Sequence, residues 1–377
     1  MSIGTPRDAS RTLGQDTTAP VAEASPSDEP TGLSLLLPEQ RTPDGQPVKV
    51  RAADDPRYAR RRLAFLFRTL VVAVLALVVV FFAAGGWYYS GRIERSALQV
   101  GPVAADPRTE FATPKAALGR DVEDVTFSTE LGQQQAWFVP GKKTTWAILV
   151  HGKGEDRSEM LRMMRAPVRA GLPALDITYR NDADSPLDPS GRYQFGRSEW
   201  RDLAAAVVYA TDHGAEHVVL IGSSMGGGIV ASYLRQSPIH DQVAGVVLDS
   251  PMLDLGTVVG YGAEQEPMPV LGHVPGPLTW TAERIATLRY GVSWSAVDYL
   301  DDSRWLDVPT LVFHGTADKT VPVALSRRLA ARHPGRVTLD VVPGAPHVGS
   351  WNADPVAYDA TATRFLDRVA PDVTVTR

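Results

Sequence analysis

The sequence predicts an α/β domain built on a mostly parallel sheet, preceded by one membrane-spanning helix and a polar tail. From Asp121 onward, short runs of β-branched apolar residues alternate with segments whose apolar residues recur at helical spacing. This alternation is typical of a parallel sheet that helices cover on both faces. An uncharged apolar run over 69–89 predicts the membrane-spanning helix. The chain therefore divides into a tail, an anchor and a globular domain.

The overall composition excludes several classes of function. The chain has 377 residues and a net charge of -5, so it lacks the basic excess that binds nucleic acid. It contains no cysteine, which rules out disulfides, thiolate catalysis and zinc–thiolate sites. We therefore expect no nucleic-acid partner.

The first segment, 1–56, is rich in Pro, Ser, Thr, Asp and Gly and has few aromatic residues. Such a segment cannot bury enough apolar surface to offset the entropy that ordering costs, so we predict a disordered tail. Five arginines lie between 57 and 68, directly before the apolar run, whereas two arginines and one glutamate follow it closely. Because the arginine-rich flank of a span stays in the cytoplasm, the tail is predicted to be cytoplasmic and the globular domain extracytoplasmic.

The apolar run 69–89 is long enough to cross the hydrocarbon core of a bilayer as a helix. It ends on Trp87, Tyr88 and Tyr89, at the position of an interfacial aromatic belt. The alternatives are a buried core helix, which would carry some polar residues, and a cleaved signal peptide, which would be shorter and would lack the long preceding tail. We predict an uncleaved signal anchor in the cell membrane, followed by a proline-containing linker over 92–117.

The globular domain is predicted over 121–371. Strands are expected at 124–129, 134–139, 146–150, 174–179, 218–221, 243–248, 310–313 and 337–342, and helices at 158–170, 198–213, 323–332 and 355–369. The proline-rich stretch 252–306 interrupts this rhythm and is too long for an ordinary loop. We predict that it forms a cap over the ligand-binding edge of the sheet, the alternative being a helical pair packed elsewhere.

A candidate nucleophile lies between a buried strand and a helix. Residues 222–226 read Gly-Ser-Ser-Met-Gly, which fits the pattern G-x-S-x-G with Ser224 at its centre. A strand that turns into a helix within so few residues strains the backbone at the middle position, and the flanking glycines leave room for the bend. The alternative is a small-residue turn with an incidental serine. The strand before and the helix after favour a nucleophile elbow.

A serine nucleophile needs a base and an acid that orients the base, and in this chain order the acid precedes the histidine. Asp318 and His347 each follow a predicted strand, so they are expected at the same rim of the sheet as Ser224. We predict His347 as the base and Asp318 as the acid. Asp249 also ends a strand and is the alternative acid, although bracing its own loop is the preferred interpretation.

The oxyanion of a tetrahedral intermediate needs two aimed N–H donors. The Met225 N–H at the start of the predicted helix is one candidate, and the Lys153 N–H in the His-Gly-Lys-Gly loop after strand 146–150 is the other. His151 has no partner at metal-ligand spacing, so no metal site is expected.

A second polar patch follows the strand 174–179 and is predicted to border the substrate pocket. It contains Arg180, Arg192 and Tyr193. The arginines can recognise an anionic group on the substrate, or they can form solvated ion pairs. We predict Arg180 and Tyr193 as substrate-binding residues.

Taken in order, residues 151–154, 222–226, 315–318 and 346–347 resemble the α/β-hydrolase superfamily, in particular its serine aminopeptidase and monoacylglycerol-lipase-like branches. The resemblance covers the catalytic rim of the domain. It implies the α/β-hydrolase fold, with an eight-stranded sheet, a Ser-Asp-His triad and no cofactor.

These observations predict a membrane-anchored serine hydrolase that cleaves a carboxylic ester through an acyl-enzyme, with a small-molecule or lipid ester as substrate. Two alternatives stay open. The same triad can serve an envelope peptidase or acyltransferase, and a hydrolase fold can act as a binding module without catalysis.

Overall fold

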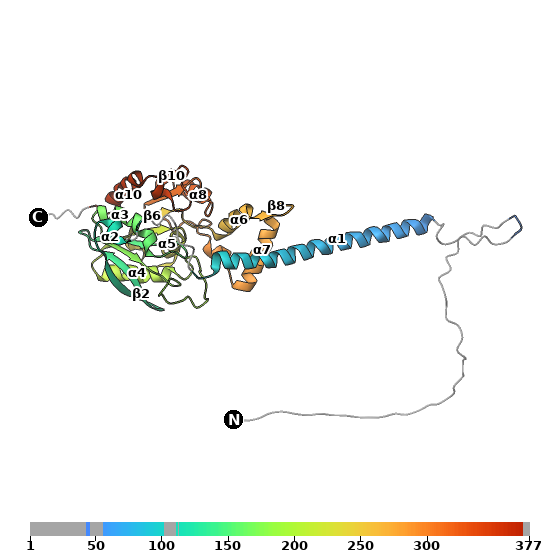
Figure 1. Cartoon of the computed structure of the whole chain (residues 1–377), viewed down its shortest axis with the longest axis horizontal. Coiled ribbons are helices and arrows are strands. Elements are labelled where there is room, and N and C mark those ends of the chain that lie inside the picture. Colours follow the sequence, from blue (N-terminus) through green and yellow to red (C-terminus); the bar gives the residue numbers. More distant parts are fainter. Residues whose placement is uncertain (1–42, 46–55, 102–110, 112, 372–377) are drawn as a thin grey trace, which may run out of the picture. The chain divides into compact units, whose positions relative to one another are not determined.

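The computed structural model describes residues 43–45, 56–101, 111 and 113–371. The chain forms two compact units, 1–71 and 72–377, and their boundary falls inside helix α1 (Pro56–Ile93) (Figure 1). Apart from a turn at 43–45 and Pro56, the tail predicted over 1–56 lies outside the described residues. The site described below lies wholly within the second unit.

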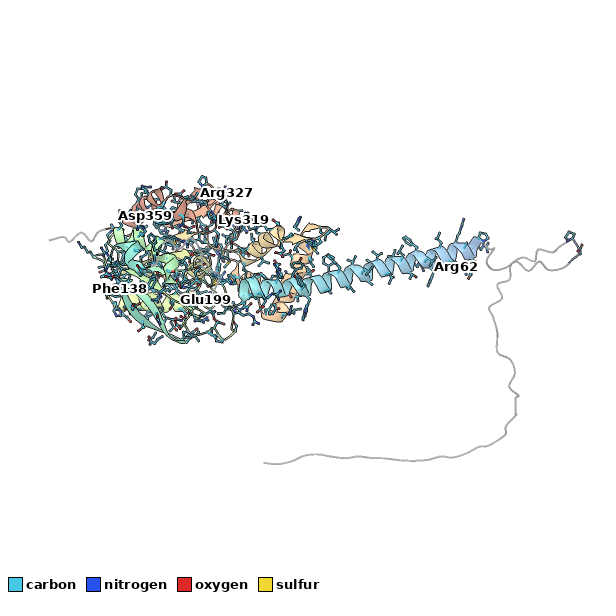
Figure 2. All side chains as sticks on the ribbon, in the orientation of Figure 1. Arg62, Phe138, Glu199, Lys319, Arg327 and Asp359 are labelled. Atoms are coloured by element: carbon cyan, nitrogen blue, oxygen red, sulfur yellow. The ribbon has the colours of Figure 1, made fainter. Side chains whose placement is uncertain are left out.

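Helix α1 begins with an arginine-rich segment over 57–68 and is then uncharged and apolar on all sides to Trp87. Its side chains project from Arg62 onward without covering one another, as Figure 2 shows. Within the described part of the chain it is the one helix that is long and apolar enough to cross a membrane, and the most apolar stretch of it is not buried. Burial begins at Gly86, near the end of the predicted span.

The helical backbone does not stop where the predicted linker 92–117 begins. A π-helical turn, η2 (Glu94–Leu98), continues directly from α1, and Leu98 is buried in the core. A short helix, α2 (Pro114–Leu118), forms near the other end of the predicted linker. Residues 102–110 and 112, between them, lie outside the described residues.

The globular domain is organised on an eight-stranded sheet in the order β1-β2-β4-β3-β5-β6-β9-β10. The two pairs β1–β2 and β2–β4 are antiparallel, and the other neighbours are parallel. The strands are β1 (Glu123–Thr129), β2 (Gly132–Val139), β3 (Thr145–Val150), β4 (Ala174–Ile177), β5 (His217–Ser223), β6 (Val243–Asp249), β9 (Thr310–Gly315) and β10 (Val337–Val342). This confirms the predicted mostly parallel sheet, with every predicted strand present.

Helices cover both faces of this sheet. Alternate residues of β3 point to opposite faces: Ile148 and Val150 belong to the core on one face, and Ala147 and Leu149 to the core on the other. The first core includes side chains from α4 (Trp200–Asp212), α5 (Met225–Gln236) and α8 (Ala324–Arg332), and the second includes side chains from α3 (Leu161–Arg169) and α10 (Pro355–Val369). Strands buried on both faces explain the continuous apolar runs in the sequence.

The stretch predicted as a cap is mainly helical. It contains α6 (Leu255–Gln265), the two short strands β7 (Pro267–Met268) and β8 (Gly272–His273), α7 (Gly276–Tyr290) and the turn η5 (Trp294–Val297). The remaining short elements are η3 (Arg157–Met160), η4 (His240–Gln242) and α9 (Ser350–Ala353). Figure 1 shows α6 and α7 together, outside the layers of the main sheet.

Candidate active site

The strand–turn–helix at the end of β5 holds Ser224 in a strained conformation. Its φ is 47° and its ψ is -115°, in a region that non-glycine residues rarely occupy. The bend brings α5 against the sheet so closely that a Cβ at Gly226 would lie 2.1 Å from the Val150 oxygen. A Cβ at Gly222 would lie 2.8 Å from the Gly226 oxygen. Glycine is therefore required on both sides of the serine, and the turn presents its hydroxyl at the carboxyl edge of the sheet.

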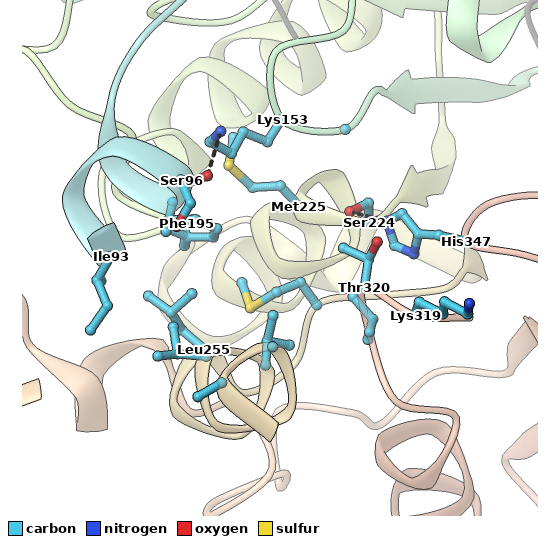
Figure 3. A pocket seen from close by; sticks show the side chains of 18 of the residues that line it. Ile93, Ser96, Lys153, Phe195, Ser224, Met225, Leu255, Lys319, Thr320 and His347 are labelled. Atoms are coloured by element: carbon cyan, nitrogen blue, oxygen red, sulfur yellow. Dashed lines mark hydrogen bonds between the residues drawn. The ribbon is translucent and has the colours of Figure 1, made fainter. Parts of the chain in front are cut away.

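The loops after β9 and β10 bring two further side chains to this serine. His347 Nε2 lies 2.9 Å from Ser224 Oγ, and His347 Nδ1 lies 2.8 Å from Asp318 Oδ2. The three predicted residues thus form one continuous chain of hydrogen bonds, although 123 positions separate the serine from the histidine. Figure 3 shows Ser224 and His347 facing each other across the cavity edge. In this order the carboxylate orients the imidazole and the imidazole faces the hydroxyl, as nucleophilic catalysis by serine requires.

Asp318 is held as a carboxylate. Its Oδ1 accepts the N–H groups of Thr320 and Val321, both at 2.8 Å. Burial alone would raise the pKa of Asp318, but hydrogen bonds from His314 and His347 outweigh it and hold the pKa well below its ordinary value. A fixed negative charge beside Nδ1 favours the tautomer that leaves Nε2 free to accept a proton.

The alternative acid, Asp249, does not contact His347. Its Oδ1 accepts the hydroxyls of Ser350 at 2.9 Å and Ser250 at 3.2 Å, and the Ser250 Oγ in turn accepts the Val348 N–H at 3.1 Å. Burial raises the pKa of Asp249 to about 6. This geometry matches the preferred interpretation that Asp249 braces its surroundings, here including the loop that carries His347.

The two predicted oxyanion donors belong to the helix that begins after Ser224 and to the loop after β3. Met225 is the first residue of α5, where a backbone N–H has no acceptor within the helix. Lys153 lies in the loop after β3, and its side chain reaches over the cavity to donate to the Ser96 oxygen at 3.1 Å (Figure 3). Burial lowers the pKa of Lys153. The backbone of this loop approaches the serine closely, since a Cβ at Gly152 would lie 3.3 Å from the Ser224 Cβ.

Hydrogen bonds to the side chain of Glu159 fix the loop that carries Lys153. One carboxylate oxygen of this buried residue accepts the Gly152 N–H at 2.6 Å and the Ser223 hydroxyl at 2.9 Å, and the other accepts from Arg162 at 3.3 Å. Glu159 therefore joins the loop 151–154, called the oxyanion loop after its predicted role, directly to the turn that carries Ser224. It lies in the 3-10 turn before α3, and nothing in its sequence context distinguishes it from an ordinary surface glutamate of a helix.

His151, at the start of the same loop, is fully buried between two acceptors. Its Nδ1 lies 2.8 Å from the Gly152 oxygen and its Nε2 lies 2.9 Å from Asp182 Oδ2, and its ring stacks on Tyr179. Two acceptors require a proton on both ring nitrogens. Burial lowers the pKa of His151, but the charge and hydrogen bond of Asp182 outweigh it and raise the pKa to about 9. Among the described residues, no group of His, Asp and Glu gathers into a metal site.

The candidate nucleophile and base open into a cavity of about 570 Å³. Its walls come from the oxyanion loop, the elbow, the loops after β9 and β10, the cap helices α6 and α7, and the end of α1 with η2. Most of the cap side chains that line it are apolar: Leu255, Val258, Val259, Ala263, Val274 and Ala282. The stretch predicted as a cap therefore borders the site.

The two predicted substrate-binding residues lie outside this cavity. Arg180 is buried against Asp202, with its Nε 2.8 Å from Oδ2, and it also binds Glu130 at 2.9 Å. Its guanidinium is fully engaged in the protein, so its position does not support substrate binding. Tyr193 is also buried and lies beneath the Lys153 ammonium, 5.4 Å from ring centroid to Nζ. It contacts the oxyanion loop rather than the cavity.

Three features of the site had no counterpart in the predictions. Glu159 is one. His314 is another: it lies inside β9 with its Nε2 3.3 Å from Asp318 Oδ2, and an apolar strand gave no reason to select it. The third is the contribution of the helix end, 89–97, which the predicted linker obscured.

Known proteins resemble this chain across the same region. Residues 146–280 match the family model described as serine aminopeptidase, S33. An uncharacterized protein of Mycobacterium tuberculosis is 28% identical over 311 residues, covering 80% of this chain and 95% of the relative. A match of that extent reaches beyond the globular domain into the end of α1. A monoacylglycerol lipase of Mycolicibacterium smegmatis is 25% identical over 231 residues, covering 53% of this chain and 80% of the lipase.

Among solved structures, the esterase Pf2001 of Pyrococcus furiosus superposes with a TM-score of 0.54 at 21% identity, covering 73% of this chain and 98% of the esterase. That likeness concerns the fold. Together with the sheet order and the strained serine turn, these matches confirm the fold that the sequence predicted. The chain has the α/β-hydrolase fold.

Proposed function

We propose that this protein is a membrane-anchored serine hydrolase that cleaves a carboxylic ester through an acyl-enzyme. The observation that carries the proposal is the hydrogen-bonded chain from Ser224 through His347 to Asp318, with distances of 2.9 and 2.8 Å. The apolar cavity beside it, and the esterase and lipase among the similar proteins, favour an ester as substrate.

The reaction follows from this geometry. Ser224 Oγ attacks the ester carbonyl carbon while His347 Nε2 takes the hydroxyl proton. The oxyanion that forms accepts the Met225 and Lys153 N–H groups. When the carbon–oxygen ester bond breaks, His347 gives its proton to the departing alcohol and the acyl group stays on Ser224. Water then attacks the acyl carbon with His347 as base, which releases the carboxylic acid and restores the serine.

We also propose that α1 crosses the cell membrane, with the tail in the cytoplasm and the hydrolase domain on the other side. The exposed apolar surface of α1 supports the span, and the arginines before it support the orientation. The test is protease protection in intact cells with the membrane sealed. Protease added outside should digest the hydrolase domain, and protection of this domain until the membrane is opened would contradict this orientation.

The nucleophile is tested on the full chain in detergent micelles with short p-nitrophenyl esters and a fluorophosphonate probe. Ser224→Ala should abolish labelling and lower kcat by about 10⁶. Ser128→Ala is the matched control, because Ser128 is exposed on β1 and bonds only to Gln133. Turnover of folded Ser224→Ala at the native rate would exclude the proposed nucleophile, and folded native protein without label or turnover would point to a binding module.

A peptidase is the second candidate, because the matching family model is described as a serine aminopeptidase. An aminopeptidase needs a carboxylate to hold the free amino group of its substrate. Two cavity carboxylates are already bound to arginines: Glu159 to Arg162 at 3.3 Å, and Glu266 to Arg92 at 2.8 Å. A third carboxylate, that of Glu155, also lines the cavity. Comparison of kcat/KM for aminoacyl p-nitroanilides with that for p-nitrophenyl esters separates the two functions.

A further inference from the structure

The substrate cavity is not enclosed by the hydrolase domain alone. Five of its lining residues come from the last turns of α1 and from η2: Tyr89, Arg92, Ile93, Ser96 and Ala97. All belong to the same compact unit as the candidate triad. In Figure 3, Ile93 and Leu255 occupy one end of the cavity, and Ser224 and His347 the other. The end of the predicted anchor is therefore a wall of the site.

This wall is fixed to the cap. Side chains of α7 pack so closely on the α1 backbone at Gly86 that a Cβ there would lie 2.7 Å from Thr281 Cγ2 and 2.9 Å from Ile285 Cδ1. Nearby, Arg289 Nη1 donates to the Trp87 oxygen at 3.1 Å, and its guanidinium lies over the indole ring. Helix α1 thus contacts the cap through close packing and a charged hydrogen bond, not through a flexible tether.

The wall is also fixed to the oxyanion loop. Lys153 Nζ donates to the Ser96 oxygen at 3.1 Å, and the Tyr193 N–H donates to the Leu98 oxygen at 2.9 Å. Both acceptors belong to η2. The segment that follows the predicted span is therefore held between the cap and the loop that carries one proposed oxyanion donor.

The surface of this end of the cavity is apolar and extends to the outside of the cap. Ile93 is buried opposite Leu255 and Val258. Outside, Val270 is fully exposed at the tip between β7 and β8, and Trp280 is 57% exposed on α7. Helix α7 contacts α1 near the end of the proposed span 69–89, so Trp280 would lie near the interface of a bilayer around α1, where tryptophan is favoured.

We propose that the end of α1, through Ile93 and Ala97, forms part of the acyl-chain site, and that the substrate is an ester with a long acyl chain drawn from the lipid leaflet around α1. This inference rests on the proposed esterase function. A long chain would lie along the apolar wall between α1 and the cap, with its ester carbonyl at Ser224. The side chain at position 93 then contacts the acyl chain, so a larger residue there shortens the chain that the enzyme accepts and a smaller one weakens the binding of a long chain.

The test uses the full chain reconstituted in phosphatidylcholine vesicles, with p-nitrophenyl butyrate and p-nitrophenyl decanoate as probes. Ile93→Trp should lower the ratio of kcat/KM for decanoate to that for butyrate at least about tenfold. Leu77→Trp is the matched control, because Leu77 is an exposed apolar residue of α1 far from the cavity lining, and its ratio should stay native. Ile93→Ala, which only removes bulk, should raise KM for decanoate about fivefold and serves if the tryptophan variant does not fold.

Two results would overturn the proposal that Ile93 lines the acyl-chain site, provided that butyrate is still hydrolysed. One is an unchanged ratio of kcat/KM for decanoate to that for butyrate in folded Ile93→Trp, and the other is an unchanged KM for decanoate in Ile93→Ala. Failure of the proposed function looks different, because Ser224→Ala would then hydrolyse butyrate at the native rate. A separate measurement tests whether the ester substrate enters the cavity from the lipid leaflet. At constant bulk decanoate, turnover should fall as added phospholipid in the same vesicles dilutes the ester, whereas a rate set by bulk concentration alone would exclude it.

Discussion

Glu159 offers the sharpest test of how the site is held together. It is 5% exposed, and one of its oxygens joins Gly152 of the oxyanion loop to Ser223 of the elbow. Glu159→Gln keeps the shape but removes the charge that Arg162 and both donors share. Hydrogen bonds to a charged group contribute about 1.5–3 kcal/mol each, and a glutamine still accepts one of them, so we expect the free energy of unfolding to fall by about 2 kcal/mol.

The kinetic effect should exceed what stability alone predicts. Releasing Gly152 would let the neighbouring Lys153 N–H, the proposed oxyanion donor, change its position, and loss of one oxyanion donor costs about 10²–10³ in kcat. Partial displacement should lower kcat about tenfold at temperatures where the variant is fully folded, with KM little changed. Chemical denaturation and steady-state ester hydrolysis measure both quantities. Glu216→Gln is the control, since Glu216 is exposed at the opposite end of β5. Native kcat and native stability in folded Glu159→Gln would refute the bridging role.

Three further outcomes are expected. Asp318→Asn should lower kcat for a p-nitrophenyl ester by about 10⁴ with the fold retained. Asp249→Asn should keep most of the activity, because Asp249 binds Ser350 and not the His347 imidazole. The reverse order of the two effects would make Asp249 the acid. The pKa of His151 in the folded protein is raised to about 9 from 6.5, so charged His151 stabilises the fold fully below about pH 6.5 and loses this effect as the pH rises through 9. Thermal melts should therefore show that the free energy of unfolding falls by about 3 kcal/mol between pH 6.5 and 10. The variant His151→Asn should not show this fall. Gly86→Leu should lower the free energy of unfolding of the full chain by about 1–3 kcal/mol in denaturant titrations. Gly260→Leu is the control and should have no such effect, because a Cβ at Gly260 would have nothing within 4 Å. Equal effects of the two substitutions would argue against the close contact of α1 with α7.

Much of the fold could be predicted because the strands are buried on both faces. Such strands are continuous apolar runs, as in β5, and their carboxyl ends meet at one edge. The residues directly after those runs were therefore the right place to search, and Ser224, Asp318 and His347 lie together in the structure. Side chains whose role depends on distant backbone groups left no such signal. Glu159 acts through the N–H of Gly152, and backbone donors look alike in any sequence.

The substrate-binding prediction for Arg180 failed for a related reason. An arginine after a strand looks available for a ligand, but Asp202 from α4 and Glu130 from the turn after β1 bind it. The predicted linker begins with Arg92 and Glu94, and the partners of these charges are also far away in the sequence. In the structure they pair with Glu266 of the cap and Arg192 of the loop before α4. Charges that pair across the fold cannot be distinguished in sequence from charges that face water.

The unbroken passage from α1 into η2 has a geometric consequence for the proposed function. An α-helix rises about 1.5 Å per residue, so Ile93 lies only about 6 Å beyond Tyr89, where the predicted span ends. The headgroup layer on each side of a bilayer is of similar thickness, about 5–7 Å. The wall of the cavity would therefore stand within the headgroup layer of the surrounding lipids. A flexible linker would let the site drift from that height, but the contacts of Arg289 and Lys153 with the helix end hold it there. Substrate could then enter the cavity with part of its chain still in the leaflet.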